Sequence, residues 1–186
     1  MKILKWMIIT VAVLALLTIF VGMPMMKEQT KKYSPEVTTT YTQNGYDLSV
    51  VYCSPSKKDR VIFGELVPYD KVWRTGANEA TTFTTATAIK IMGKDLPAGT
   101  YSLWTRPRAQ NWDVIFNKEV PDWGVTILSA GAATTRNAKN DIFTVTVAVE
   151  NLAMVNEKFS INFENKGQLH LALAWDKTKI SIPISK

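Results

Sequence analysis

Apolar positions follow two patterns along the chain, and the first is an unbroken run near the N-terminus. Residues 6–23 contain no charged side chain and follow Lys2 and Lys5. A run of about 18 apolar residues is at the short end for a bilayer-spanning helix and is longer than the core of most signal peptides. We therefore expect residues 1–23 to be a membrane anchor or a signal segment; the third alternative is a buried helix of a globular domain.

The residues that flank this run favour the anchor. The chain leaves the run through Val21-Gly22-Met23-Pro24, which fits poorly with the small residues expected at the −3 and −1 positions of a signal-peptide cleavage site. Lysines lie on both sides, so the positive-inside rule does not fix the orientation. The threonine-rich region that follows is typical of a domain that crosses the membrane. We expect residues 24–34 to be a linker and residues 35–186 to lie outside the cytoplasm, in the cell envelope or periplasm, either anchored by one transmembrane helix or exported.

The second pattern is the alternation of apolar and polar residues after Pro35, which is typical of β-strands with one buried face. Asn44-Gly45 separates two such runs and predicts a hairpin, because both residues tolerate positive φ. Compact hairpin connections are also expected at 165–167 and 176–178. The strands predicted by alternation lie at 37–42, 46–53, 80–91, 100–105, 112–117, 142–149, 158–164, 168–175 and 179–184.

Two stretches, 54–78 and 118–140, break the alternation. Connections of this length tend to carry function or a short helix. The short turns elsewhere require antiparallel pairing, and the apolar face of each strand must be covered by a second sheet. The predicted fold is an all-β antiparallel β-sandwich of about nine strands, preceded by one N-terminal hydrophobic helix. A closed β-barrel is the alternative.

Charge and composition exclude several classes of function. The formal net charge is +6, but the basic residues are scattered and form no block, so we expect no nucleic-acid partner. Cys53 and His170 are the single cysteine and the single histidine. We interpret Cys53 as a small buried apolar residue rather than a nucleophile with a histidine base, and His170 as a solvent-facing strand residue rather than a metal ligand. No metal or cofactor is expected, since no ligand spacing, phosphate-binding loop or nucleophile elbow is found.

Three segments carry a family resemblance. The first runs from Arg60 to Thr81, the second from Gly93 to Leu103, and the third comprises Trp112 to Lys118 with Trp123-Gly124. Together they resemble the bacterial domain-of-unknown-function 2911 family, over roughly Ser34 to the C-terminus. The resemblance implies an exported single domain and transfers no catalytic role. The small-residue stretch around 131–140 departs from the family pattern.

The first of these segments contains the densest group of polar candidates. Arginine offers a planar fork for anions, asparagine donates and accepts, glutamate can act as acid or base, and tryptophan offers a flat face to a sugar or a cation. The alternative is structural: Arg74 pairs with Glu79 while Trp73 fills the core. The predicted ligand-binding residues are Arg60, Trp73, Arg74, Asn78 and Glu79.

Tryptophans recur through the predicted domain, and on β-sandwiches such residues either bind sugar rings or, more often, fill the core. Alternation places Trp112 and Trp175 with apolar neighbours, so we expect both in the core. Trp104 falls opposite Tyr101 and Leu103, which leaves an exposed position open as the alternative to the core that we favour for the set.

Three hypotheses for function follow. The preferred one is a non-catalytic binding or structural module of the cell envelope, tethered to the membrane by its N-terminal helix, with a small-molecule, sugar or protein ligand at the 60–79 loop. The alternative is an envelope hydrolase in which Glu79 is the acid or base and Arg74 stabilises an anion; Asp47 and Asp113 are further acids by residue type only. The third is an assembly domain with an exposed aromatic patch.

Overall fold

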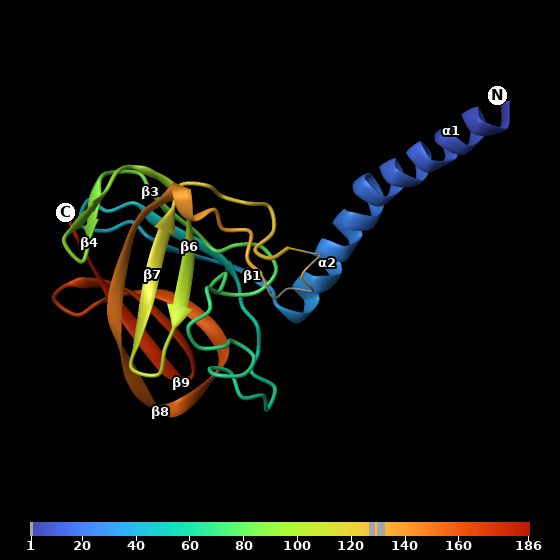
Figure 1. Cartoon of the computed structure of the whole chain (residues 1–186). Coiled ribbons are helices and arrows are strands. Elements are labelled where there is room, and N and C mark those ends of the chain that lie inside the picture. Colours follow the sequence, from blue (N-terminus) through green and yellow to red (C-terminus); the bar gives the residue numbers. More distant parts are fainter. Residues whose placement is uncertain (1, 127–128, 130–132) are drawn as a thin grey trace. The chain divides into compact units, whose positions relative to one another are not determined.

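The computed structural model describes residues 2–126, 129 and 133–186, and the chain divides into two compact units, Met1–Tyr33 and Ser34–Lys186 (Figure 1). Part of the irregular stretch predicted at 118–140, including most of its small residues, lies outside the described residues.

The first unit is helical throughout. Helix α1 (Lys2–Leu17) leads through a π-helical turn (Thr18–Gly22) into α2 (Met23–Tyr33). Residues Ile3–Tyr33 form one helix that is long and apolar enough to cross a membrane. The segment predicted to be a linker is therefore helical as far as Tyr33. Pro24 lies inside this helix, directly after the π-helical turn, where the regular α-helical hydrogen-bond pattern is already interrupted. The lysine, glutamate and glutamine residues that follow are good helix formers.

The second unit is a nine-stranded antiparallel sheet with the order β1-β2-β3-β6-β7-β8-β9-β4-β5. Since β1 and β5 lie at its two ends, the sheet is open, and the prediction of an all-β sandwich rather than a closed barrel is confirmed. The strands are β1 (Glu36–Tyr41), β2 (Leu48–Cys53), β3 (Thr82–Thr85), β4 (Ile89–Ile91), β5 (Lys94–Leu96), β6 (Gly99–Pro107), β7 (Asn111–Asn117), β8 (Asp141–Asn165) and β9 (Leu169–Ser185).

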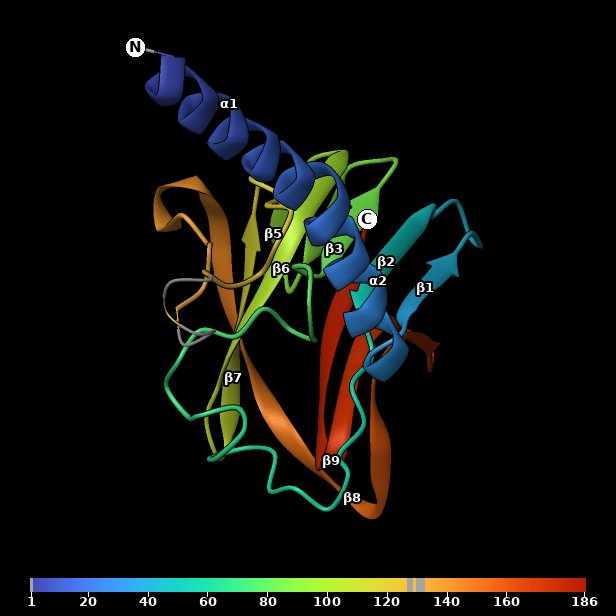
Figure 2. The same cartoon turned by 90° about the vertical axis from the view of Figure 1, so that its right-hand side faces the viewer.

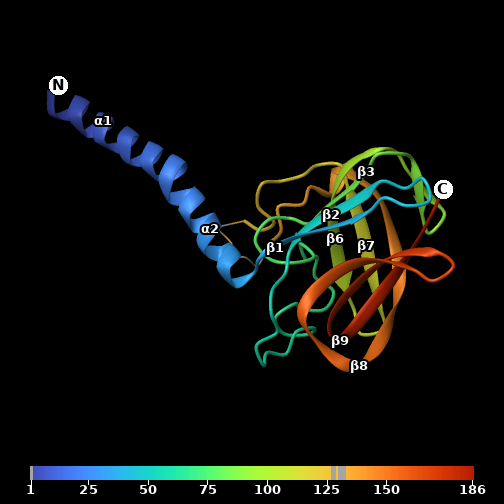
Figure 3. The ribbon, with the colours of Figure 1, turned by 180° about the vertical axis from the view of Figure 1, so that it is seen from behind.

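Strand β8 belongs to both layers of the sandwich. Its first part, Asp141 to Ala148, pairs with β7, and the rest, from Val149 to Asn165, pairs with β9 (Figures 2 and 3). Register shifts between Asn151 and Ser160 accompany the change of partner. These irregularities let the strand bend and twist, as bulges do in other sheets.

The core lies between the inward faces of the two layers. Alternation is realised in β7, where Trp112, Val114 and Phe116 enter the main core, and in β9, where Trp175 does so. The core assignment of Trp112 and Trp175 is thus confirmed. Other fully buried members are Leu48, Val50, Ile62, Phe83, Ile91, Leu96, Leu103, Phe159, Ile161, Leu171, Leu173, Ile180, Ile182 and Ile184.

Several local features differ from the predicted ones. The single strand predicted at 80–91 is two strands, β3 and β4, and the strands predicted at 142–149 and 158–164 are one strand, β8. Residues 176–178 do not form a hairpin connection, because β9 continues through them and Asp176 absorbs the irregularity at φ 53°. Trp104 is fully buried and the exposed alternative is wrong, since Val72, Ala80 and Ile115 cover it on the outer face of the sheet. The hairpin at Asn44-Gly45 is confirmed: β1 pairs with β2, and the two turn residues have φ values of 54° and 74°.

Candidate functional site

The first irregular stretch (residues 54–78) and the residues that follow it pair with β6 at two points. A short segment between these two points, the excursion, leaves the strand. Trp73 exchanges two backbone hydrogen bonds with Thr105, at 2.7 and 3.1 Å, and the Leu103 amide donates to the Thr81 carbonyl at 2.7 Å. Residues 74–80 therefore leave and rejoin the same strand. This arrangement anchors both ends of the excursion on the sheet and confines its geometry.

The excursion contains strained backbone. Thr75 is fully buried and has φ 59°, an outlier for a β-branched residue. Asn78 has φ 57° and Gly76 has φ 150°. Thr75 is held in place by the hydroxyl of Thr105, 3.1 Å from its own. Strain of this kind persists only where the surroundings over-determine it, and it gathers at functional sites.

Arg74 points from this excursion towards the second irregular stretch. Its aliphatic stem lies against Gly124 so closely that a Cβ on Gly124 would be 2.4 Å from its Cδ and 2.7 Å from its Cβ. The two stretches also meet through the Gly124 amide, which donates to the Asn78 carbonyl at 3.2 Å. The first and third segments of the family resemblance thus come together at Arg74, Asn78 and Gly124.

The Arg74 guanidinium is poorly satisfied. Its Nε is buried and has no hydrogen-bond partner among the described residues. Burial lowers the pKa of Arg74, and charge interaction with Cys53 opposes that change. Arginine nevertheless stays protonated in proteins, so this is a cation withdrawn from water with an unused donor.

A cavity of about 400 Å³ lies beside Arg74. One wall comes from the first stretch and the other from the second, where Val125 and Thr134 form an isolated bridge. The lining residues are Val67, Pro68, Lys71, Val72, Trp73, Arg74, Val125 and Thr134. Its volume falls in the range of roughly 300–1,000 Å³ that small-molecule sites occupy.

Of the five predicted ligand-binding residues, Trp73 and Arg74 line this cavity. The other three, Arg60, Asn78 and Glu79, are not among the residues that line it. Arg60 is exposed and donates to the carbonyls of Ser56 and Lys57 within its own turn, at 2.6 and 2.9 Å. Asn78 is buried and its side-chain amide donates to the Ser34 carbonyl at 3.3 Å.

Glu79 accepts a hydrogen bond from the thiol of Cys53, with Sγ and Oε2 3.4 Å apart. Cys53 itself is 2% exposed, which confirms that it is a small buried residue. His170 is partly exposed, and its Nδ1 lies 2.9 Å from the Gln168 carbonyl oxygen. No group of three His, Cys, Asp or Glu side chains that could hold a metal occurs within residues 2–126, 129 and 133–186.

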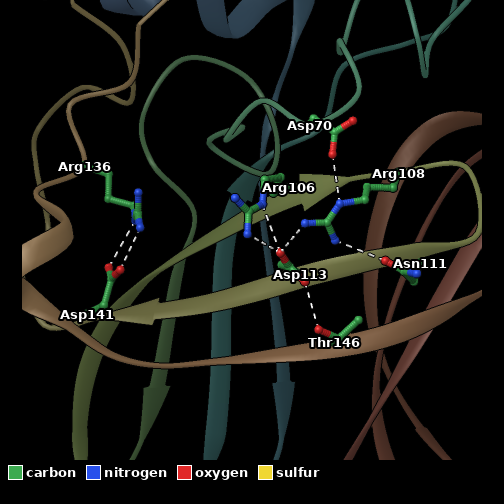
Figure 4. A network of polar contacts seen from close by, with 8 residues as sticks. All are labelled: Asp70, Arg106, Arg108, Asn111, Asp113, Arg136, Asp141 and Thr146. Atoms are coloured by element: carbon green, nitrogen blue, oxygen red, sulfur yellow. Dashed lines mark hydrogen bonds and ion pairs between the residues drawn. The ribbon is translucent and has the colours of Figure 1, made fainter.

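A second polar cluster, which the sequence analysis missed apart from Asp113, lies on the outer face of β6, β7 and β8 (Figure 4). The Asp113 carboxylate accepts hydrogen bonds from Arg106, Arg108 and Thr146, the last two at 2.9 Å. Burial acts to raise the pKa of Asp113, but these donors outweigh it and hold the pKa at about 2. A carboxylate so placed stays ionised at neutral pH and is unsuited to donate a proton.

This cluster also fixes the wall of the cavity. Arg108 extends from Asp113 to Asp70, with Nε and Oδ1 2.9 Å apart, and to Asn111. The Asp70 amide donates to the Pro107 carbonyl at 2.9 Å. The segment from Val67 to Arg74 is therefore tied to the β6–β7 turn at one end and to Thr105 at the other.

The comparisons with known proteins give one finding. A family model described as "Protein of unknown function (DUF2911)" matches residues 34–184. No curated protein and no solved structure matches the chain.

Proposed function

The chain belongs to the DUF2911 family, whose function is unknown. We propose that residues 35–186 form a non-catalytic binding module of the cell envelope, and that its ligand occupies the cavity beside Arg74. The observation that carries the proposal is a cavity of about 400 Å³ whose described lining contains two cations, Lys71 and Arg74, and no carboxylate.

The N-terminal helix supports the envelope location. Ile3–Tyr33 is compatible with a membrane span or a signal anchor, and none of its most apolar window is buried within the structure. We propose that this helix holds the module at the membrane with residues 35–186 outside the cytoplasm. Protease protection of right-side-out vesicles tests the orientation: cleavage of the domain by external protease is expected, and full protection would contradict it.

The hydrolase alternative has less support. A hydrolytic acid or base must reach the substrate directly or through one water. No carboxylate occurs among the described residues that line the cavity, and Glu79 instead accepts the Cys53 thiol. The substitution Glu79→Gln tests the alternative, since a hydrolase that uses this carboxylate would lose turnover while keeping its substrate affinity, whereas a binding module has no turnover to lose.

Ligand-induced thermal shift of the full chain in lipid nanodiscs tests the proposal. The probes are glucose, N-acetylglucosamine, dialanine, acetate and hexanoate, which represent envelope sugars, peptides and small anions. At least one probe is expected to raise the Tm of the wild-type protein and of the control Lys118→Gln, which removes an exposed charge outside the cavity. The same probe should have little effect on Arg74→Gln.

The proposal fails if no probe shifts the Tm of the wild type, or if Arg74→Gln responds as strongly as the control. Near-UV circular dichroism of each variant must first show an intact core. If Arg74→Gln is unfolded, Lys71→Gln provides a second change within the cavity lining.

A further inference from the structure

The lining of the cavity beside Arg74 combines aliphatic and cationic side chains, and this combination favours one class of ligand. Four of its lining residues, Val67, Pro68, Val72 and Val125, are aliphatic. Lys71 and Arg74 are cationic, and Thr134 adds one hydroxyl. A ligand that fills such a space needs an apolar body and a negatively charged group.

The cationic side of the cavity lacks a compensating carboxylate. None lines the cavity among the described residues, and Asp70, one residue from Lys71, is bound by Arg108 at 2.9 Å. Glu79 accepts the Cys53 thiol. A charge withdrawn from water is normally paired, so the Arg74 guanidinium, which is only partly exposed, favours an anionic guest.

Packing holds Arg74 towards that guest. The stem of Arg74 lies against Gly124, leaving no room there for a larger residue, and the excursion that carries it is anchored to β6 at Trp73 and Thr81. A planar guanidinium held this way suits a carboxylate, which can accept two parallel hydrogen bonds. Preorganisation of this kind lowers the entropy cost of binding.

The size and walls of the cavity narrow the class further. About 400 Å³ is at the low end for ligand sites and suits a metabolite rather than a polymer. An inorganic anion would leave the aliphatic walls without contacts. A sugar would lose water from several hydroxyls against a lining in which Thr134 is the one hydroxyl residue among those that the structure describes.

We infer that the cavity binds a small amphipathic carboxylate, with its head at Arg74 and Lys71 and a short aliphatic or aromatic body against Val67, Val72 and Val125. This inference rests on the proposed binding function and specifies its ligand class. Charge-assisted hydrogen bonds are roughly twice as strong as neutral ones, and each buried methylene adds roughly fourfold to affinity.

Three matched probes separate the charge from the apolar body: hexanoate, its neutral isostere hexanamide, and acetate. Their Kd values are measured by isothermal titration on the full chain in lipid nanodiscs, with empty nanodiscs as the reference. Hexanoate is expected to bind at least tenfold more tightly than hexanamide and than acetate. In Arg74→Gln the preference for hexanoate over hexanamide should fall to less than threefold, whereas Lys118→Gln should retain it.

Equal affinity of the wild type for hexanoate and hexanamide overturns the inference while leaving a binding function in place. Equal affinity for hexanoate and acetate overturns the amphipathic part. If none of the three probes binds, the inference falls, and the sugar and peptide probes of the thermal-shift panel then decide whether the proposed binding function falls with it. The comparison of the three probes on the wild type uses no variant, so this test stands even if Arg74→Gln misfolds.

Discussion

Replacing Gly124 with alanine should destabilise the contact between the two irregular stretches. The added Cβ would lie 2.4 Å from Arg74 Cδ, 2.7 Å from its Cβ and 3.1 Å from its Cγ. The Cδ can move by a rotamer change, but the Cβ is fixed to the backbone and can move only with it. Gly124 does not have positive φ, so the strain comes from packing alone.

The magnitude follows from two opposing effects. Overpacking costs typically about 1–3 kcal/mol. Replacing glycine with alanine also restricts the unfolded chain, which stabilises the protein by roughly 0.4–1 kcal/mol. We therefore expect Gly124→Ala to lower the free energy of unfolding by about 1–2 kcal/mol, which lowers the Tm by roughly 4 °C in a domain of this size.

Thermal unfolding followed by near-UV circular dichroism measures this effect on the full chain in nanodiscs. The double variant Arg74→Ala/Gly124→Ala provides the control, because it removes the Cγ and Cδ contacts and leaves the Cβ contact. The cost of the alanine should be smaller in that background by at least 0.5 kcal/mol, as expected for coupled neighbours. An unchanged Tm, or the same loss in both backgrounds, would refute the packing argument.

Three further predictions concern other parts of the domain. Asp113→Asn should lower the free energy of unfolding by about 2 kcal/mol at pH 7. The wild type should lose that stability as the pH falls from about 4 to about 2, because the folded pKa of about 2 lies below the ordinary 3.8. Acid unfolding curves that coincide for the two proteins would contradict this. Met92→Asn should raise stability by about 0.5–1 kcal/mol in chemical denaturation, since Met92 is 43% exposed, has φ 49° and precedes Gly93 in the β4–β5 turn; destabilisation would count against it. Gly76→Ala should cost about 3 kcal/mol or more, because its Cβ would lie 2.8 Å from the Cys53 carbonyl oxygen at φ 150°; a Tm within 2 °C of the wild type would be incompatible with that contact.

Alternation accounts for most of the fold that could be predicted from the sequence. Trp112, Val114 and Phe116 show why: a two-residue period in a strand determines which side chains share a face. It does not determine what covers the other face. Trp104 has the polar neighbours of an exposed residue, yet a distant loop residue, Val72, packs over it. Such long-range covering leaves no local signal.

The same limit applies to the candidate site. Arg74 and Trp73 could be proposed from their residue types and their place in a long connection. Val125 and Thr134 could not, because their contact with the first stretch depends on how two irregular segments fold against one sheet. Arg106 and Arg108 lie two residues apart on one strand and its turn, but only the register of β6 with β7 brings them to Asp113.

Strand β8 has a consequence for how the domain loses its structure. Because one uninterrupted strand supplies hydrogen-bond partners to β7 and to β9, neither layer can detach without depriving the other of a neighbour. Amide protons of β7 and β9 should therefore exchange with solvent through a single global opening, with similar protection on both sides. A fold with a separate edge strand for each layer would permit stepwise opening. Here the shared strand makes the two layers unfold together.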